Sequence, residues 1–556
     1  MENTTYYLWA LQNFVVDEPP LQGTNMQQSL TQRALDTILS QVNPCDSDGD
    51  DIDLQPDSDS DLSSDDETRP QPKRARLGSD LSQTATDGTA WREERVGARL
   101  PLTPTEAYAA DGEPTAAAKR SVSSRLESFL RFITLDMLHS IQQCTVQHAR
   151  RTDHDSWFVD IPELMAFISI ILFRGVVKLP SLSDYWSATL GQPLVTGTMS
   201  RDRFQDIMRH LRFDDSSTRV ERAKTDEFAA VSHVWRSFVS NCVSSYSPGA
   251  HVAVDALLFP TKTRCRFLQY VASKPERFGL KFWVACDAKS KYICNVLPCL
   301  GKDPSGPSAD VVMRLMEPFL DTGRNVTTDS RFTSLSLAQR LRSRKTTILG
   351  AVDENHWEIP QSAKQTDRRP FTTQVFSTSG AALTAYARTR RTRVHVLSSM
   401  HSVVHAENAP KRKPNTVALY DSTRSGVDAM AQMLRNHSVR AATRRWPVAV
   451  FYVMIDMAAL NAHALYEACT GRKEGRADFL AELATELANP HVGEKRARKE
   501  QLLRQQPPAP EPGKRAVCQV KHRCKENRTT RRCVGCYKYS CGRCIKQTPW
   551  LCHYCE

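Results

Sequence analysis

The spacing of apolar residues divides the chain into helical and strand-like stretches. Between Ser121 and Tyr246 apolar side chains recur every three or four positions, which predicts helices that bury one face. Residues 251–300 change to β-rich runs with a turn suited to a hairpin at Lys289-Ser290. This pattern predicts three strands, His251–Phe259, Lys281–Ala288 and Lys291–Leu300.

The pattern after residue 300 predicts alternating helices and strands. The pattern predicts a helix at Ala309–Leu320, a strand that ends near Asp329, a helix at Leu335–Leu341 and a strand at Thr346–Val352. The resulting β-β-β-α-β-α-β order is that of an RNase H-like core. Residues 353–424 interrupt it with short strands and basic loops.

Helical character returns in the C-terminal third. It begins again at Val427, and Trp446-Pro447 is expected to open a long helix because proline suits the first helical position. One more helix precedes Asn489-Pro490, and residues 491–515 are interpreted as a charged, Gln/Pro-rich linker.

The N-terminal 120 residues are predicted to be largely disordered. Residues 46–67 carry eleven Asp and Glu and no Lys or Arg, and little apolar periodicity follows Val42. Leu30–Val42 is compatible with one short amphipathic helix. The cluster Pro72-Lys-Arg-Ala-Arg76 is interpreted either as a nuclear import signal, gripped by an import receptor, or as a basic linker.

Charge and hydropathy narrow the class of protein. The formal net charge is +12 despite the acidic run, which favours a polyanionic partner such as nucleic acid. The longest largely apolar run, Leu164–Phe173, has ten residues including Ser169 and is too short to span a membrane. The N-terminus has no basic n-region, so we expect an intracellular protein without a secretory signal.

Three aspartates stand at the edges of apolar runs. Asp255 and Asp329 lie at or near strand ends, and Asp428 follows a glycine and is expected to open a helix. Taken singly, such an aspartate is most often a cap or turn residue. Brought together, the three carboxylates can hold two divalent cations that activate water for in-line phosphoryl displacement. An all-oxygen site favours Mg²⁺, or Mn²⁺, over a soft metal.

The C-terminal tail carries the strongest motif that needs no comparison. Eight of the sixteen cysteines fall in four closely spaced pairs, and three of the pairs have zinc spacing. The two-residue spacing typical of zinc ligands is that of Cys533 and Cys536, Cys541 and Cys544, and Cys552 and Cys555, and these pairs are preceded by Cys518 with His522 and Cys524. Eight ligands fit two tetrahedral Zn²⁺ ions, and we favour an interleaved cross-brace with the first and third pairs on one ion. His522 could replace Cys518 or Cys524. Disulfides are the weaker interpretation in an intracellular chain.

Basic residues accompany both candidate sites. Lys262, Arg264 and Lys274 lie near the Asp255 strand and either position phosphates or form a solvated rim. Arg528, Arg531 and Arg532 make the cysteine-rich tail basic, which suits DNA contacts. A protein-binding module of the RING or PHD kind is the alternative, since zinc cross-braces host both functions.

Several stretches together resemble the piggyBac family of DNA transposases. The resemblance runs from about Ser124 to Tyr466 and resumes in the cysteine-rich tail. Its motifs are Arg201-Asp-Arg-Phe-Gln-Asp-Ile-Met-Arg-His-Leu-Arg-Phe213, Pro260-Thr-Lys-Thr-Arg-Cys265, Asn325-Val-Thr-Thr-Asp329, Ser425-Gly-Val-Asp428 and Thr443-Arg-Arg-Trp-Pro447.

The resemblance implies a nuclear, Mg²⁺-dependent cut-and-paste transposase. Asp255, Asp329 and Asp428 fall on the family's catalytic metal positions. The implied partners are a second copy of the chain and double-stranded DNA, as transposon ends and TTAA targets. The tail resembles a module that binds the element's terminal DNA.

Three positions depart from the family pattern. Ala256 stands where the family usually has Glu, Ala431 where it tends to have a further acid, and Ser330-Arg331 replaces an Asn-aromatic pair. Arg331 puts a positive charge beside a site for cations. The alternatives are therefore a domesticated nuclear DNA-binding protein without catalysis, or a chromatin-associated module that uses the tail on protein.

The predicted fold is a mixed α+β or α/β multidomain architecture. It combines an RNase H-like catalytic core, a helical DNA-binding and dimerisation domain, a β-rich insertion and a cross-brace zinc domain. The predicted plan is 1–120 disordered and acidic; 121–250 and 438–490 helical domain; 251–352 and 425–437 catalytic domain; 353–424 insertion; 491–515 basic linker; 516–556 zinc domain.

Overall fold

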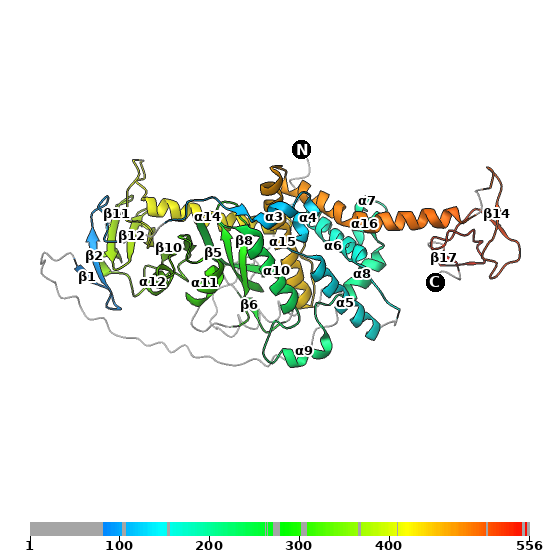
Figure 1. Cartoon of the computed structure of the whole chain (residues 1–556), viewed down its shortest axis with the longest axis horizontal. Helices are drawn as coiled ribbons and strands as arrows, with labels where there is room; N and C mark the ends of the chain where they lie inside the picture. Colours follow the sequence, from blue (N-terminus) through cyan, green and yellow to red (C-terminus); the bar gives the residue numbers. More distant parts are fainter. Residues whose placement is uncertain are drawn as a thin grey trace, which may run out of the picture.

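Eleven strands, counted over the part of the chain described below, join in one mixed sheet (Figure 1). The strand order is β1-β2-β11-β12-β13-β10-β9-β5-β7-β6, and β8 also pairs with β7. The strands are β1 Ser82–Thr84, β2 Ala90–Glu94, β5 His251–Pro260, β6 Leu268–Tyr270, β7 Phe278–Asp287, β8 Ile293–Pro298, β9 Asn325–Thr328, β10 Thr347–Val352, β11 Thr373–Thr378, β12 Ala381–Ala387 and β13 Arg393–Ser398.

The structure is a computed structural model. It describes residues 82–102, 107–152, 156–261, 263, 265–270, 278–301, 309–364, 369–408, 410–506, 510–547 and 551–552. Several predictions fall outside these ranges: the helix Leu30–Val42, the import signal at 72–76, the cations Lys262, Arg264 and Lys274, and the ligand Cys555.

The central strands follow the predicted order. β8, β7 and β5 pair antiparallel, whereas β5, β9 and β10 pair parallel. A parallel neighbour needs a crossover connection. The crossovers contain α11 (Ala309–Met316) with η3 (Glu317–Phe319) before β9, and α12 (Leu335–Ser343) before β10. The predicted strand and helix sequence is confirmed here, with the short strand β6 as an unexpected addition.

The strands of the predicted insertion extend the same sheet. β11, β12 and β13 form an antiparallel meander, and β13 pairs antiparallel with β10. The expectation that residues 353–424 interrupt the sheet order is thus wrong for its strands, which add to the β10 edge. The edge strand of a sheet has unpaired backbone N–H and C=O groups to which another strand can pair. The local sequence does not predict which strand will pair there.

The helix that carries Asp428 begins earlier than predicted. α14 runs from Asn415 to Asn436, so Asp428 lies inside the helix and does not open it. Gly426 is a packing position: a Cβ there would lie 2.6 Å from the carbonyl oxygen of Ala288. The glycine that suggested a helix boundary instead allows α14 to approach the end of β7 closely.

Part of the N-terminal region is ordered, contrary to prediction. β2 pairs antiparallel with β11, and β1 pairs with β2, so residues 82–94 complete one end of the sheet. Trp91 is only 2% exposed and donates its indole N–H to the carbonyl of Glu358 at 2.8 Å. Further along, β3 (Glu113–Pro114) and α3 (Ala116–Ser121) also form. A single buried tryptophan gives no periodicity, and pairing with a distant strand supplies the order.

Helices from both ends of the chain pack together beside the sheet (Figure 1). α16 lies against α6 and α4, and α15 against α4. These helices, with their neighbours, are α4 Arg125–Leu130, α5 Leu135–Thr152, α6 Ile161–Val176, η2 Leu182–Trp186, α7 Pro193–Thr198, α8 Arg201–His210, α9 Ser216–Arg222, α10 Ser232–Ser245, α15 Trp446–Thr470 and α16 Arg476–Arg504.

Two of the quoted motifs meet in this helical region. The Arg445 guanidinium donates to the carbonyls of Arg209 and Leu211 at 3.2 and 3.1 Å, which satisfies groups at the C-terminal end of α8. The Trp446 ring packs on Phe228 at 5.6 Å between centroids. As predicted, α15 begins at Trp446-Pro447, and these motif residues hold the fold together.

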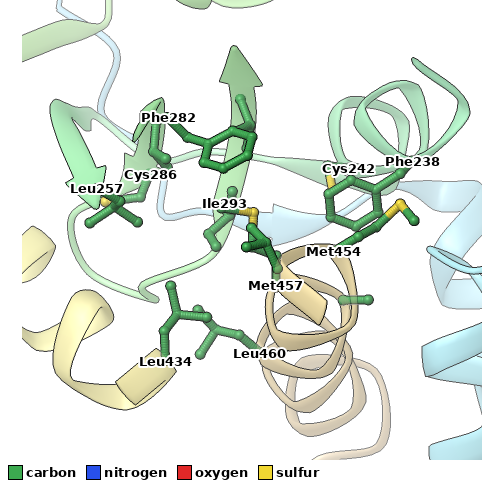
Figure 2. Close-up of a cluster of buried hydrophobic side chains, with 14 of the residues drawn as sticks. Phe238, Cys242, Leu257, Phe282, Cys286, Ile293, Leu434, Met454, Met457 and Leu460 are labelled. Carbon is green, nitrogen blue, oxygen red and sulfur yellow. The ribbon is translucent and has the colours of Figure 1, made fainter. Parts of the chain in front are cut away.

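α15 crosses the centre of the molecule. Figure 2 shows Met454, Met457 and Leu460 of this helix beside Phe282 and Ile293 of the sheet. Across the described ranges, it is the one helix long and apolar enough to cross a membrane, and 94% of its most apolar window is buried within the protein. Core helices meet the same criterion.

α16 continues where a linker was predicted. The helix runs through Pro490 to Arg504, so the expectation of a linker over 491–515 is wrong for its first half. Ala, Glu, Lys, Arg, Gln and Leu dominate this stretch, and all are good helix formers. The composition of a charged linker is also that of an exposed helix, and the packed first half of α16 provides a nucleus for it.

Asp456 on α15 gives the fold a predicted pH dependence. Burial raises its pKa to about 7, although hydrogen bonds from Ser438 and Val439 act in the opposite direction. Because the folded pKa exceeds the unfolded one, stability should fall as pH rises from about 4 through about 7. We expect Asp456→Asn to flatten this part of the pH profile of the unfolding temperature. An unchanged slope in the variant would contradict the assignment.

Candidate carboxylate site and cysteine module

Parallel pairing brings Asp255 and Asp329 to the same level of the sheet, although Asp255 lies in the middle of β5 (His251–Pro260) and not at the strand end that the sequence predicts. Val254 of β5 is the register partner of Thr328 of β9, and each aspartate is the next residue along its strand direction. Asp329 follows β9 directly and its carbonyl accepts the N–H groups of Phe332 and Thr333, which turns the chain away. The two carboxylates therefore lie on neighbouring strands at the same level.

Arg331 bridges this carboxylate pair. One of its terminal nitrogens, Nη2, lies 3.0 Å from Oδ1 of Asp255 and 2.6 Å from Oδ2 of Asp329. Its Nε donates to the same Asp329 oxygen at 2.7 Å, and its backbone N–H donates to the other oxygen at 3.1 Å. A guanidinium that engages two carboxylates forms charge-assisted hydrogen bonds, the stronger kind.

Electrostatics within the site reflect the crowding of the two acids. Burial, followed by the negative charge of Asp329, raises the pKa of Asp255 above its ordinary value. The backbone N–H of Ala256, at 2.6 Å, and the guanidiniums of Arg331 and Arg424 act in the opposite direction. Burial and the neighbouring acid thus disfavour the charged form of Asp255, and the nearby cations offset part of that effect.

Asp428 belongs to the same region through Arg424. α14 packs against β5, and Arg424 and Asp428 lie one turn apart on this helix. The Arg424 guanidinium interacts electrostatically with Tyr420 and with both Asp428 and Asp255. Among the described residues, the oxygens of the three aspartates do not form a set lying within 4.8 Å of one another. The structure joins Asp255 and Asp329 through Arg331 and places Asp428 on the adjoining helix.

The two alanine departures supply no further ligand. Ala256 and Ala431 are both partly buried and pack against the main hydrophobic core. Lys281, by contrast, adds a third cation near the pair, since it interacts electrostatically with Asp329 and Asp255. Burial lowers the pKa of Lys281, and its ammonium lies 4.0 Å from the centre of the Trp283 ring.

As arranged, this site does not fit two divalent cations. The oxygens that would bind metal accept hydrogen bonds from Arg331. The positive charges of Arg331, Arg424 and Lys281 offset the three carboxylates that would balance metal charge. A metal ion would have to displace the Arg331 guanidinium from both carboxylates, and it would then bind beside the further positive charge of Arg424.

The cysteine tail forms the interleaved grouping that its spacing predicts. The Sγ atoms of Cys518, Cys524, Cys541 and Cys544 all lie within 4.8 Å of one another, and so do those of Cys533, Cys536 and Cys552. The first and third pairs thus share one centre, and the second pair shares the other with Cys552, the described member of the fourth pair. Cys518 and Cys524 both belong to the first group, which has no need of His522.

The sulfur geometry fits tetrahedral zinc. Cys544 and Cys524 are 3.6 Å apart between Sγ atoms, and Cys536 and Cys552 are 3.8 Å apart. Two sulfurs on an ion with Zn–S bonds of about 2.3 Å lie ~3.8 Å apart. Hydrogen bonds among these sulfurs shift their pKa values in opposite directions: burial and neighbouring sulfurs raise the pKa of Cys524, whereas hydrogen bonds lower that of Cys541 against the effect of burial.

The basic residues of the tail have different environments. Arg528 and Arg531 are exposed. Arg532 is engaged within the module: it donates to the Tyr539 hydroxyl at 2.7 Å and its guanidinium lies 4.1 Å from the centre of that ring. Of the three predicted DNA contacts, Arg532 thus has a structural role that the sequence did not suggest.

Sequence reasoning did not identify Arg424 or Lys281 as parts of the carboxylate site. Arg424 carried a usable signal, because it precedes Asp428 by one helical turn. Lys281 carried none, since its proximity to Asp255 results from the antiparallel register of β5 and β7.

Comparison with known proteins agrees with this architecture. A protein-family model described as Transposase IS4 matches residues 125–463. The human PiggyBac transposable element-derived protein 3 is 21% identical over 418 residues, which cover 69% of this chain and 67% of that protein. The human Chimeric ERCC6-PGBD3 protein matches at the same identity, and the chain spans 38% of its length.

A solved structure is also similar. The cryo-EM structure of a piggyBac transposase synaptic complex with hairpin DNA has a TM-score of 0.66 and 27% sequence identity. The match covers 80% of this chain and all of the other. The chain is therefore a transposase-type protein with a mixed α/β fold. Within that class, the chain belongs to the piggyBac family.

Proposed function

We propose that this protein is a piggyBac-derived, double-stranded DNA-binding protein whose carboxylate site is held closed by Arg331. The observation that carries the proposal is the bridge from Arg331 to Asp255 and Asp329. The bridge satisfies the two acids from within the chain, so the fold persists without a divalent cation. DNA binding is retained in this proposal, and metal-dependent cutting is not.

Three observations support DNA as the partner. The related solved structure is a complex with hairpin DNA. The formal net charge of +12 favours a polyanion, and each neutralised phosphate releases counterions. The core supports the same proposal: the spatial order β8-β7-β5-β9-β10, antiparallel and then parallel, is the arrangement expected of an RNase H-like domain.

The remaining parts of the proposal concern metal, assembly and location. Two structural Zn²⁺ ions are proposed for the cysteine module, the second completed by Cys555. A homodimer is proposed by likeness to the family. Import into the nucleus is proposed through the basic cluster at 72–76, recognised by an import receptor.

A metal-dependent transposase acting at TTAA targets is the second candidate. Retention of Asp255 and Asp329 at the same level of adjacent parallel strands favours it. Under that candidate Arg331 would leave the carboxylates when DNA and Mg²⁺ bind, and Asp428 would complete the ligand set.

Replacing Arg331 tests the choice. We expect the unaltered chain to bind duplex DNA, to leave supercoiled plasmid intact in Mg²⁺ or Mn²⁺, and to show no tight Mn²⁺ site by electron paramagnetic resonance. Arg331→Asn should bind Mn²⁺ about tenfold more tightly or better, because a charge in contact with the pair is removed. Arg344→Asn, which breaks the exposed pair with Asp321, is the matched control and should change nothing.

The opposite result would establish the second candidate. Mg²⁺-dependent nicking by the unaltered chain, abolished by Asp255→Asn, Asp329→Asn or Asp428→Asn with DNA binding intact, would show that Arg331 is displaced in the working complex.

A further inference from the structure

A cluster of cations lies at the tip of the β12–β13 hairpin. Ala387 and Arg393 are the last register partners of the two strands, so residues 388–392 form the tip. A loop just before α14 adds further basic residues. We call this set the hairpin patch; its members are Arg388, Arg390, Arg391, Arg393, Lys411, Arg412 and Lys413.

The hairpin and the loop are fixed to each other. The Tyr386 hydroxyl donates to the carbonyl of Lys411 at 2.6 Å. Asp421 of α14 accepts a hydrogen bond from Arg388 of the hairpin and pairs with Lys413 of the loop at 2.7 Å. Two segments that are separate in the sequence, 388–393 and 411–413, thus present their cations as one surface.

The tip itself has a defined backbone. The Thr389 hydroxyl accepts the N–H groups of Arg391 and Thr392 at 3.2 and 3.0 Å, and Arg388 donates its N–H to the carbonyl of Thr392 at 2.9 Å. Arg390 and Arg391 are exposed on this turn. Their position is therefore set before any partner arrives, which lowers the entropy lost on binding.

The hairpin patch contains more cations than the ones held in structural contacts. Asp421 pairs with Arg388 and Lys413. Arg393 donates to the carbonyl of Lys364, so it also has a structural role. Arg390, Arg391, Lys411 and Arg412 are exposed, and within the described part of the chain they form no ion pair of this kind.

We propose that the hairpin patch is a second DNA-binding surface that grips duplex phosphates independently of the carboxylate site and the cysteine module. The inference rests on the proposed function and adds a contact that neither the aspartates nor the tail provides. Arginine donors on a rigid protruding turn suit phosphate oxygens, and contacts of this kind position DNA without reading its sequence.

The test compares salt dependence in two charge-matched variants of the full chain. Arg390→Gln/Arg391→Gln removes two charges from the patch. Arg472→Gln/Lys473→Gln removes two exposed charges from the loop between α15 and α16. Binding of a fluorescein-labelled duplex of arbitrary sequence is followed by anisotropy over a range of salt concentrations, with thermal unfolding as a check on folding.

We expect the patch variant alone to change the salt slope. Two lost phosphate contacts should reduce the slope of log K against log salt by about 2 and weaken binding about tenfold or more at low salt. The control should keep the slope of the unaltered chain. In the unaltered chain, amide exchange at 388–392 should slow when duplex is added.

Three outcomes would overturn the inference. Equal slopes for both variants, with no protection at 388–392, would exclude the patch as a DNA contact while the proposed function stands. Loss of binding to polyglutamate without loss of DNA binding would assign the patch to an acidic protein. If the unaltered chain binds no duplex, the proposed function fails first.

Discussion

Removal of metal from the full chain is expected to unfold the cysteine module and leave the rest folded. Excess zinc chelator should remove two ions from each chain, and native mass spectrometry would measure that loss. Amide exchange over 516–547 should then approach the rate of unfolded peptide. The reason is the make-up of this small core: Cys518, Cys533, Cys541, Cys544 and Cys552 are buried in it, with Val520 as the one other buried member of the cluster within the described residues.

The expected effect is large because binding and folding are one process here. Apparent free energies of about 10–16 kcal/mol are typical for structural Zn²⁺ at neutral pH. A polar segment of this size has no other means of burying enough apolar surface. Without metal, several sulfurs would also be held in close contact with no bond between them.

Single substitutions should separate the two centres. Cys541→Ser should lose the ion shared with Cys518, whereas Cys533→Ser should lose the ion shared with Cys552. Cys469→Ser, a half-buried thiol at the end of α15, is the control and should keep both ions. Slow amide exchange in the module in excess chelator would contradict the prediction, as would a disulfide found by mass spectrometry.

Trp91→Ala is expected to release the N-terminal end of the sheet. Trp91 is 2% exposed and its indole N–H is bonded to Glu358. Loss of a buried tryptophan costs about 3–5 kcal/mol, enough to detach an edge made of two short strands. Native-state amide exchange should therefore show lower free energies of opening at β1, β2 and β11, with the parallel strands β9 and β10 unchanged.

The chain offers a matched control in Trp357. This side chain is 62% exposed and belongs to the same turn as Glu358. Trp357→Ala should change the opening free energies by no more than about 0.5 kcal/mol, the usual range for a surface substitution. An equally small effect of Trp91→Ala would show that the Trp91 side chain does not hold this end of the sheet in place.

The carboxylate site was only partly predictable. The apolar runs of β5 and β9 predicted both aspartates at or near strand ends, which holds for Asp329 but not for Asp255, and parallel pairing brings the two together. The sequence also showed that Arg331 follows Asp329 closely. That its guanidinium reaches back across two strands depends on side-chain torsions and on the β5–β9 register, which no local pattern contains.

The errors share one physical cause. β2 forms because the β11 edge accepts it, Gly426 lies inside a helix because α14 must approach Ala288, and residues 491–504 are helical as an extension of a packed helix. In each case a contact with a distant segment outweighs a local preference of at most about 1 kcal/mol per residue.

By itself the sequence determined the family, the order of the core strands and helices, and the grouping of the cysteines. Those features follow from local periodicity and from the spacing of ligand residues, both of which can be recognised in the sequence alone. Only the tertiary structure decided that the insertion strands join the main sheet, that Asp428 stands apart from the other two acids, and that Arg331 closes the site. Burial and strand pairing stabilise contacts between residues whatever their separation along the chain. The neighbours of a strand and the partners of a side chain therefore depend on distant segments as well as on the local sequence.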